Sequence, residues 1–295
     1  MANEPAIHDS LTVLIPCFNE EAMIAATARA VHNTFAAAGV ACELIIINDG
    51  STDGTAAQVA ALDLPVRVLT NPHCCGYGFS LKRGLRAATR GWIAIIDADG
   101  TYPVERFPDL WAQRREFDMI VGARTGERVS IPTLRKPAKW FIGQLANYLA
   151  GQRIPDLNSG MRIFRRDLAL TFVNILPDGF SFTTTITLAA LTSGHLVQYL
   201  PIDYFKRHGE SKIRFYHTLD FSLLVVRLIT YFKPLKIFFP IAGLFVTLGL
   251  ARLLVRLADG ASIGEATILL IVAGIQIGLI GLLADMLVKS RGVGR

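Results

Sequence analysis

Cysteine is scarce in this sequence of 295 residues, and its four cysteines suit neither a zinc site nor a disulfide framework. They are Cys17, Cys42, Cys74 and Cys75, and the adjacent pair could form a disulfide only with strain. The first residues also lack the basic start and apolar core of a secretory signal peptide. We therefore expect the main domain to lie in a reducing, cytosolic compartment.

Two phosphate-binding signatures are absent as well. A dinucleotide-binding fold carries Gly-x-Gly-x-x-Gly after its first strand, whereas this chain has Pro16-Cys-Phe-Asn-Glu20 at that place. The sequence contains no Walker phosphate loop, no internal repeat and no low-complexity tract. A nicotinamide or flavin enzyme is therefore not expected.

The chain instead alternates short apolar runs with helical segments. The expected strands cover residues 11–15, 43–47, 66–69, 92–96, 118–122, 161–165 and 195–204. This alternation, at spacings of about 20–30 residues, predicts an α/β fold with a doubly wound, mostly parallel sheet. Pro16 is expected to end the first strand, and Asn19 and Glu20 to cap the next helix, which Gly39 would end.

The excess of apolar residues lies at the C-terminal end. Hydrophobic residues make up 52% of the chain, and its mean hydropathy is +0.40. Residues 235–257 and 266–284 are nearly or fully long enough to span about 30 Å of hydrocarbon, although a signal anchor or a buried core helix is the alternative for each. Basic residues before the first span and after the second predict a multi-pass hairpin in the inner (plasma) membrane, with the main domain and both termini cytoplasmic.

A basic segment connects the main domain to this hairpin. The net charge is +6, and lysines and arginines crowd between Lys206 and Lys236. Nucleic acid is one interpretation, but the adjacent apolar spans favour an anionic membrane surface, so no nucleic-acid partner is expected. Residues 217–232 predict an amphipathic helix in the membrane interface, with an ordinary domain-closing helix as the alternative. The predicted divisions are residues 1–214, 215–233 and 234–295.

Two carboxylates follow the fourth expected strand. Asp97 and Asp99 come directly after the apolar run 92–96, and Gly100 follows them. They should lie at the carboxyl edge of the sheet, where open α/β sheets bind ligands. Such close carboxylates repel each other unless a cation or hydrogen-bond donors share the site, and hard oxygen ligands suit Mg²⁺ or Mn²⁺. Taken alone, the pair could also be a solvated acidic turn.

Two further polar loops belong to the same predicted edge. Pro16, Asn19 and Glu20 follow the first strand, and the loop 48–55, which contains Asp49, follows the second. A carboxylate at Asp49 can accept a hydrogen bond from the imide N–H of uracil or from the N–H groups of guanine. A cation on the carboxylate pair could then bind the diphosphate and stabilise the charge that develops on it as it leaves.

Together these motifs resemble family 2 glycosyltransferases, which have the Rossmann-like GT-A fold. More narrowly, the chain resembles polyprenyl-phosphate glycosyltransferases, the group of dolichol-phosphate mannose synthase and its bacterial undecaprenyl-phosphate relatives. The resemblance runs from about Thr12 to Lys212 and includes the C-terminal hairpin. It implies transfer of a hexose-type sugar from a UDP- or GDP-linked sugar donor to a polyprenyl phosphate at the cytoplasmic membrane face.

The resemblance also implies roles for individual residues. The candidate nucleotide-sugar-binding residues are Pro16, Asn19, Glu20, Asp49, Asp97 and Asp99, of which Asp97 and Asp99 would bind the metal. Arg124 and Arg162 match basic positions near the phosphates. Arg207, Ser211 and Lys212 match the closing loop before the membrane helices. Members of this group often form oligomers, and the expected helix 134–149 is a candidate homo-oligomer interface.

The sequence departs from the family pattern at three places. Dolichol-phosphate mannose synthases usually carry glutamine where this chain has Thr101, and glutamate within the segment corresponding to Phe182–Thr187. The Gln-x-x-Arg-Trp of processive members is absent. The identity of the sugar is therefore open, and one candidate general base is missing.

A missing base fits a phosphate acceptor. A hydroxyl acceptor must lose a proton as it attacks, whereas a lipid phosphate is largely ionised at neutral pH. We expect an in-line displacement with inversion, and we take Asp97, Asp99, Arg124 and Asp156 as candidate catalytic residues. Asp156 could orient a reacting group or simply cap a loop. The alternatives are a family 2 enzyme acting on a lipid or glycan hydroxyl, and an inactive membrane-tethered nucleotide-binding scaffold.

Overall fold

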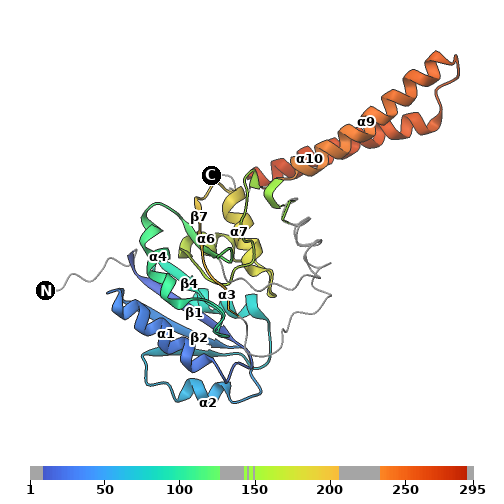
Figure 1. Ribbon diagram of the computed structural model, residues 1–295. Coiled ribbons are helices and arrows are strands. Elements are labelled where there is room, and N and C mark those ends of the chain that lie inside the picture. The colour runs from blue at the N-terminus through green and yellow to red at the C-terminus, as the bar shows by residue number, and fades with distance from the viewer. Residues whose placement is uncertain (1–8, 127–142, 145, 149, 206–232, 291–295) are drawn as a thin grey trace.

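The computed structural model describes residues 9–126, 143–144, 146–148, 150–205 and 233–290. Its centre is a seven-stranded sheet with the order β3-β2-β1-β4-β6-β5-β7 (Figure 1). The strands are β1 (Leu11–Cys17), β2 (Cys42–Asn48), β3 (Val66–Thr70), β4 (Trp92–Ile95), β5 (Met119–Ala123), β6 (Arg162–Arg165) and β7 (Val197–Pro201). Only β6 is antiparallel to its neighbours within the described chain. The predicted α/β fold with a mostly parallel sheet is confirmed.

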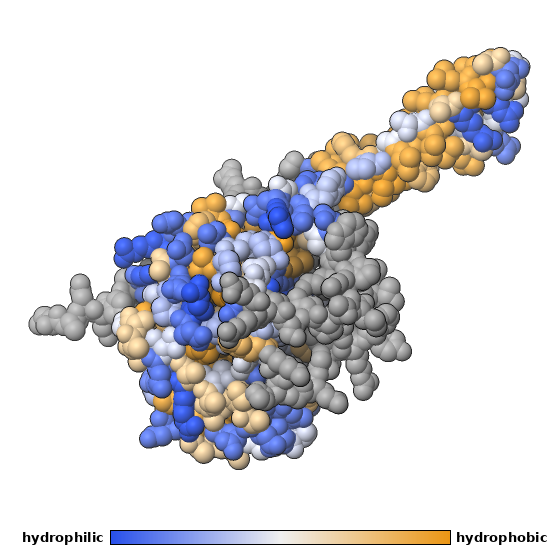
Figure 2. Space-filling model, in the orientation of Figure 1, coloured by the Kyte–Doolittle hydropathy of each residue, from blue (hydrophilic) through white to orange (hydrophobic). Residues whose placement is uncertain are grey.

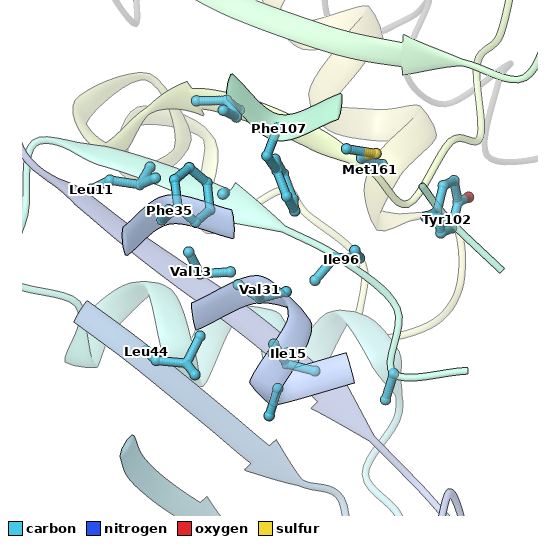
Figure 3. Packing of buried hydrophobic residues seen from close by; sticks show 14 of the residues in the cluster. Leu11, Val13, Ile15, Val31, Phe35, Leu44, Ile96, Tyr102, Phe107 and Met161 are labelled. Atoms are coloured by element: carbon cyan, nitrogen blue, oxygen red, sulfur yellow. The ribbon is translucent and has the colours of Figure 1, made fainter. Parts of the chain in front are cut away.

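Helices cover both faces of the sheet, because successive side chains of a buried strand point to opposite faces. They are α1 (Ile24–Ala37), α2 (Thr55–Ala60), α3 (Tyr77–Ala87), α4 (Phe107–Ala112), α6 (Arg166–Phe172) and α7 (Phe182–Thr192), with the 3-10 turns η2 (Val104–Arg106) and η3 (Gln113–Arg115). Val13 of β1 belongs to the core beneath α1 and α4, whereas Leu14 belongs to the core beneath α3, α6 and α7. Figure 3 shows the first core, in which the rings of Phe35 and Phe107 lie 5.2 Å apart.

The prediction that Pro16 ends the first strand is wrong, because β1 continues through Pro16 to Cys17. Proline has no N–H to donate to a second neighbour. The ladder between β1 and β4 ends at Leu14, so only β2 pairs with the strand at Pro16. The strand can therefore tolerate proline at this position.

The predicted side-chain cap of the first helix is also wrong. Helix α1 begins at Ile24, its N-cap residue is Met23, and no side chain caps it. The carbonyl oxygen of Glu20 instead accepts hydrogen bonds from the N–H groups of Met23 and Ile24. Gly39 follows the helix in a left-handed conformation (φ 67°), as expected of a glycine that ends a helix.

The direction of β6 determines which loop reaches the carboxyl edge of the sheet. Arg162, its first residue, pairs with Ile95 near the end of β4 and with Val121 of β5. The loop 156–160, which precedes β6, therefore lies at the same edge as the loops that follow β1, β2 and β4. The sequence pattern alone could not predict the antiparallel direction of β6.

Helices α9 (Leu235–Ala258) and α10 (Glu265–Ser290) form a hairpin that extends away from the sheet (Figure 1). Each contains a 24-residue stretch long and apolar enough to cross a membrane, about 36 Å at 1.5 Å per residue. The most apolar windows of these stretches are only 11% and 17% buried, unlike a core helix. Apolar residues predominate along the arm, and hydrophilic residues gather at its far end (Figure 2). Glycines allow the two helices to pack closely. A Cβ on Gly249 would lie 2.6 Å from Cγ1 of Ile271, and a Cβ on Gly274 would lie 2.6 Å from Cγ2 of Val246.

Several predicted features lie outside the described residues. They are the amphipathic helix 217–232, the basic loop with Arg207, Ser211 and Lys212, and most of the helix predicted over 134–149. Of that last helix, residues 143–144 and 146–148 are described and helical.

Candidate active site

The loops that follow β1 and β2 are joined by hydrogen bonds. Asn19 has the left-handed φ of 53°; its side-chain oxygen accepts from the N–H of Thr52 (2.8 Å) and its own N–H donates to Ser51 Oγ (3.0 Å). The N–H of Glu20 donates to Thr55 Oγ1 (2.8 Å). Two of the predicted nucleotide-binding positions therefore lie together at the carboxyl edge, and their backbone is held by the second loop.

Asp49, directly after β2, binds the loop that follows β3. Its carboxylate accepts from Asn71 Nδ2 (2.6 Å) and from the N–H groups of Cys75 (3.0 Å) and Gly76 (2.9 Å). Burial opposes ionisation of Asp49, but these hydrogen bonds outweigh it and lower the pKa of the carboxyl group. Asp49 is therefore a carboxylate near neutral pH, and it joins the β2 loop to the segment that leads into α3.

Asp97 lies beyond the end of β4, between a tyrosine and a glycine. Tyr77, the first residue of α3, donates its hydroxyl to Asp97 Oδ1 at 2.9 Å. On another side lies Gly160, where an added Cβ would be 2.5 Å from Asp97 Oδ2. Burial and the charge of Asp97 raise the pKa of Tyr77 well above its usual value, so its hydroxyl remains a donor.

Asp99 is held by the residue that replaces the family's usual glutamine. The hydroxyl of Thr101 donates to Asp99 Oδ1 at 2.6 Å, and the N–H of Thr101 donates to the same oxygen at 3.2 Å. The carbonyl oxygen of Thr101 in turn accepts from the N–H of Phe205, the last described residue before the basic loop. Phe205, two residues before Arg207 in the sequence, therefore lies beside the Asp97–Asp99 loop.

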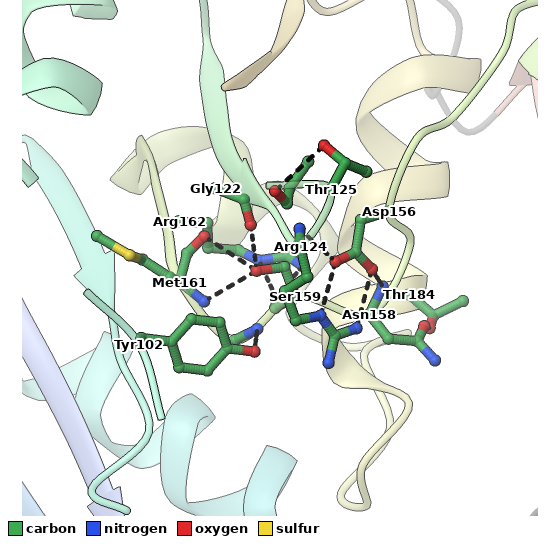
Figure 4. A network of polar contacts seen from close by, with 12 residues as sticks. Tyr102, Gly122, Arg124, Thr125, Asp156, Asn158, Ser159, Met161, Arg162 and Thr184 are labelled. Carbon is green, nitrogen blue, oxygen red and sulfur yellow. Dashed lines mark hydrogen bonds and ion pairs between the residues drawn. The ribbon is translucent and has the colours of Figure 1, made fainter. Parts of the chain in front are cut away.

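Arg124 and Asp156 form a bidentate ion pair near this edge (Figure 4). Arg124 Nε and Nη2 donate to Asp156 Oδ2 and Oδ1 at 2.7 and 2.9 Å, and the Arg124 N–H adds a third bond at 3.0 Å. Burial alone would raise the pKa of Asp156, but Arg124 lowers it below the usual value. Such a carboxylate is a weak base, and its position fits the orienting role more than proton abstraction.

Arg162 lies where the sequence did not predict it. Its side chain is fully buried, with Nε and Nη2 donating to the carbonyl oxygen of Ser159 and Nη1 to the Thr183 carbonyl and Thr187 Oγ1. The predicted phosphate contact is not available to a guanidinium without exposed surface. Arg162 instead ties the loop 156–160 to α7, and burial lowers its pKa.

The loop 156–160 has further contacts on both sides (Figure 4). Ser159 Oγ donates to the carbonyl oxygen of Gly122 at 2.5 Å, and the N–H of Gly160 donates to the hydroxyl oxygen of Tyr102 at 2.7 Å. Thr184 donates its hydroxyl to Asn158 Oδ1, so the threonine-rich segment that replaces the family's glutamate binds this loop. Contacts with Gly122 of β5, with Tyr102 and with Thr184 of α7 therefore fix the position of Gly160 beside Asp97.

The carboxylates present are compatible with a divalent cation. Across the described ranges, no group of three or more histidine, cysteine, aspartate or glutamate side chains is arranged to hold a metal. Mg²⁺ commonly uses one or two carboxylates and completes its shell with substrate phosphates and water. Asp97 and Asp99 supply hard oxygen atoms of that kind, so the donor set fits a metal that binds together with a diphosphate.

Sequence reasoning missed two residues that contact the carboxylates. Tyr77 lies 20 residues before Asp97 in the sequence, and Gly160 lies 63 residues after it. Only the tertiary structure brings these two residues next to Asp97. Gly76 and Gly78 lie on either side of Tyr77 in the sequence. They did not indicate that the tyrosine side chain reaches a neighbouring strand end.

Two family models match this chain. Residues 12–171, more than half of the chain, match the model described as Glycosyl transferase family 2. Residues 233–289 match the model described as GtrB C-terminal hairpin. The second match coincides with α9 and α10.

Curated relatives cover much of the same region. The chain is 29% identical over 212 residues to the undecaprenyl-phosphate mannosyltransferase of Micrococcus luteus, covering 68% of this chain and 86% of that protein. It is 24% identical over 216 residues to the dodecaprenyl-phosphate galacturonate synthase of Rhizobium johnstonii, covering 71% and 63%. The chain thus matches less than two thirds of the Rhizobium protein.

Solved structures share the fold at low identity. Glucosyl-3-phosphoglycerate synthase from Mycobacterium tuberculosis in complex with UDP has a TM-score of 0.57 at 17% identity, covering 77% of this chain and 86% of that one. The same enzyme with Mn²⁺, UDP and glucosyl-3-phosphoglycerate has a TM-score of 0.55 at 18% identity, covering 75% and 77%. These similarities confirm the predicted GT-A fold class.

Proposed function

This chain belongs to glycosyl transferase family 2, and we propose that it transfers a hexose-type sugar from a nucleotide-sugar to a polyprenyl phosphate. One observation carries the proposal. Asp97 and Asp99 lie at the carboxyl edge of the sheet, in a continuous set of hydrogen-bonded loops that also contains Asp49, in a chain with an apolar hairpin. The products are a nucleoside diphosphate and a polyprenyl-phosphate-sugar.

The sugar donor binds across the loops that follow β1, β2 and β4. Asp49 faces the base, and Pro16, Asn19 and Glu20 line the nucleotide. Asp97 and Asp99 would hold Mg²⁺ or Mn²⁺ on the diphosphate. When bound, that metal supplies positive charge to the leaving diphosphate.

The acceptor side needs positive charge more than it needs a base. A phosphate monoester of a lipid is largely ionised at neutral pH, so it can attack the anomeric carbon without losing a proton to the protein. Asp156 is held by Arg124, and its lowered pKa makes it a poor base. We assign acceptor phosphate binding to Arg124 and to the basic loop, which follows Phe205 in the sequence; the N–H of Phe205 donates to the carbonyl oxygen of Thr101.

The basic loop supplies Arg207, Ser211 and Lys212 to the acceptor in this proposal. Arginine binds a phosphate with two parallel hydrogen bonds, and lysine adds a compact charge. Support for a polyprenyl-phosphate acceptor comes from the relatives in Micrococcus and Rhizobium, whose names contain undecaprenyl phosphate and dodecaprenyl phosphate. The buried Arg162 is assigned no direct contact.

The membrane arrangement extends the same proposal. Residues 215–233 lie in the interface, and residues 234–295 cross the inner membrane twice with both chain ends in the cytoplasm. This arrangement would place the main domain beside the phosphate group of a lipid in the inner leaflet. The length and apolarity of the two helices support two crossings, and the basic residues near the ends of the hairpin support this orientation. Arg252 and Arg256, near the turn of the hairpin, count against it.

A transfer assay tests the proposal. The purified full chain is incubated with Mn²⁺, undecaprenyl phosphate and a panel of labelled UDP- and GDP-sugars, and the organic phase is analysed. We expect one sugar to enter the lipid fraction, and Asp99→Asn to abolish its transfer because a metal ligand is lost. Absence of labelled lipid across the whole panel would refute the proposal. Full activity of Asp99→Asn would refute the proposed metal site.

A further inference from the structure

We propose that Tyr77 is a positioning residue, which orients the Asp97 carboxylate for metal binding; the inference rests on the proposed function. Tyr77 Oη donates to Asp97 Oδ1 at 2.9 Å. Metal-binding carboxylates are commonly oriented by a hydrogen bond from a neighbouring side chain, which limits rotation of the carboxylate. Tyr77 occupies that place for Asp97.

The geometry leaves Asp97 little freedom. Tyr77 binds one oxygen, and the backbone of Gly160 lies against the other, because a Cβ there would be 2.5 Å from Oδ2. Gly160 is itself held by Tyr102 through a hydrogen bond of 2.7 Å. The carboxylate is therefore confined between α3 and the loop that precedes β6.

Tyr77 is in turn held by the loop 176–180. Its ring stacks on Phe180 with 5.9 Å between centroids and 17° between planes. The N–H of Phe79 donates to the Asp178 carbonyl at 3.0 Å, and Lys82 forms an ion pair with Asp178 at 2.5 Å. The start of α3 and the loop 176–180 lie in close contact, since a Cβ on Gly78 would be 2.0 Å from the Pro177 carbonyl oxygen.

The same segment also holds Asp49. The N–H groups of Cys75 and Gly76 bind its two carboxylate oxygens, and the next residue, Tyr77, binds Asp97. Three consecutive residues thus join the carboxylate assigned to the base and a carboxylate assigned to the metal. Gly76 has φ 108°, a backbone conformation that other residues rarely adopt, and it allows the chain to make both contacts.

The chain offers a matched control for the loss of a tyrosine hydroxyl. Tyr199 of β7 also has a buried hydroxyl, which lacks a hydrogen-bond partner in the part of the chain that the structure describes. Tyr199→Phe removes the same atom without removing a contact to a carboxylate. Any effect specific to Tyr77→Phe then reports on Asp97.

The test measures binding of Mn²⁺ to the full chain in detergent, by electron paramagnetic resonance of the free ion at saturating UDP. We expect Tyr77→Phe to weaken Mn²⁺ binding by roughly 10- to 100-fold, the usual cost of losing such a partner. UDP affinity in the presence of EDTA should stay within about twofold of the unmodified protein, since Asp49 keeps its backbone contacts. Tyr199→Phe should leave both unchanged.

Two results of this measurement would overturn the inference. One is unchanged Mn²⁺ affinity in Tyr77→Phe while the unmodified protein binds Mn²⁺ with UDP and transfers sugar, which leaves the proposed function standing. The other is no Mn²⁺ binding by the unmodified protein, which removes the metal site and the inference together. If Tyr77→Phe does not fold, Phe180→Ala keeps the hydroxyl but removes the stacked ring; it should weaken Mn²⁺ binding several-fold, and no change would also overturn the inference.

Discussion

Arg124 and Asp156 are 32 positions apart in the chain, yet their side chains meet in a bidentate ion pair with distances of 2.7 and 2.9 Å. The Asp156 side chain is 5% exposed and that of Arg124 is 16% exposed. The ion pair connects the end of β5 to the loop before β6, which carries Gly160 to Asp97. Its loss should therefore affect both the stability of the fold and the geometry of the site.

Removing one partner should destabilise the main domain. Asp156→Ala leaves a largely buried guanidinium without its counter-charge, which costs about 3 kcal/mol, the lower end for a buried pair because Arg124 retains some exposure. For a domain of this size the midpoint of thermal unfolding should fall by roughly 6–12 °C. The measurement is thermal unfolding of the purified chain by intrinsic fluorescence.

A double-mutant cycle provides the control for this prediction. The variant Arg124→Met/Asp156→Leu lacks both charges, so its loss should be clearly smaller than the sum of the losses in Arg124→Met and Asp156→Leu. Additive losses would mean that the two side chains do not stabilise each other.

The same pair predicts a dependence on pH. The pKa of Asp156 is lowered in the folded chain, so its stabilising contribution is fully present above the unfolded value of about 3.9 and is lost as pH falls through the folded value. The difference in unfolding temperature between the unmodified protein and Asp156→Ala should be constant from about pH 5 to 8 and shrink below about pH 4. A difference that shrinks as pH rises from 5 to 8 would have the wrong sign for this carboxylate.

Gly160→Ala should reduce activity without unfolding the protein. The new Cβ would meet the Asp97 carboxylate at 2.5–2.8 Å, and a side-chain end can move away more easily than backbone. A displacement near 1 Å at a reacting centre costs roughly 100-fold in rate. Gly143→Ala is the control, because none of the described residues outside its own helical turn has an atom within 4 Å of the added Cβ.

The readouts for these alanine variants are initial transfer rate and unfolding temperature. We expect Gly160→Ala to lose most of its transfer rate with little change in unfolding temperature, and Gly143→Ala to retain both. Full activity in Gly160→Ala would mean that the position of Asp97 beside this loop is unimportant for the reaction.

Lys236 at the start of α9 binds Tyr148 in the main domain. Lys236 Nζ donates to the Tyr148 carbonyl at 2.7 Å and lies 5.2 Å from its ring, and the Tyr148 hydroxyl donates to the Lys236 carbonyl at 3.3 Å. Exposed contacts of this kind contribute about 0.5–1 kcal/mol. Tyr148→Ala should therefore lower the fraction of docked hairpin and reduce transfer to lipid about two- to five-fold.

This docking prediction has a close control in Tyr148→Phe. Phenylalanine keeps the ring and the carbonyl contact, so most of the activity should remain. UDP affinity should be the same in both variants. Tyr148 contacts Lys236 of the hairpin, whereas Asp49 contacts the segment that leads into α3. Equal transfer rates for alanine, phenylalanine and tyrosine at this position would show that the contact does not matter.

Sequence reasoning predicted the strands and the edge at which the site lies, because both follow from local patterns. Apolar runs mark buried strands, and the carboxyl ends of parallel strands meet at one edge of a sheet. Asp49, Asp97 and Asp99 could be placed together in this way. The hairpin could also be predicted, because its two segments are long and apolar enough to cross a membrane.

The same reasoning could not predict which residues hold the carboxylates. The resemblance implied a position near the phosphates for Arg162, whereas the structure buries its side chain against α7. The direction of β6 and the contacts of Tyr77 depend on tertiary structure, which no local pattern specifies. The role of Pro16 as a strand end was wrong because it depends on how far the neighbouring strand β4 extends.

The central claim is that the acceptor group is a phosphate, and one comparison tests it most directly. The purified chain, with Mn²⁺ and the sugar donor it uses, is offered undecaprenyl phosphate and undecaprenol side by side, and the lipid products are analysed by mass spectrometry. We predict a sugar linked to the lipid phosphate and no glycosylated undecaprenol. Glycosylation of undecaprenol with undecaprenyl phosphate left unmodified would contradict the account.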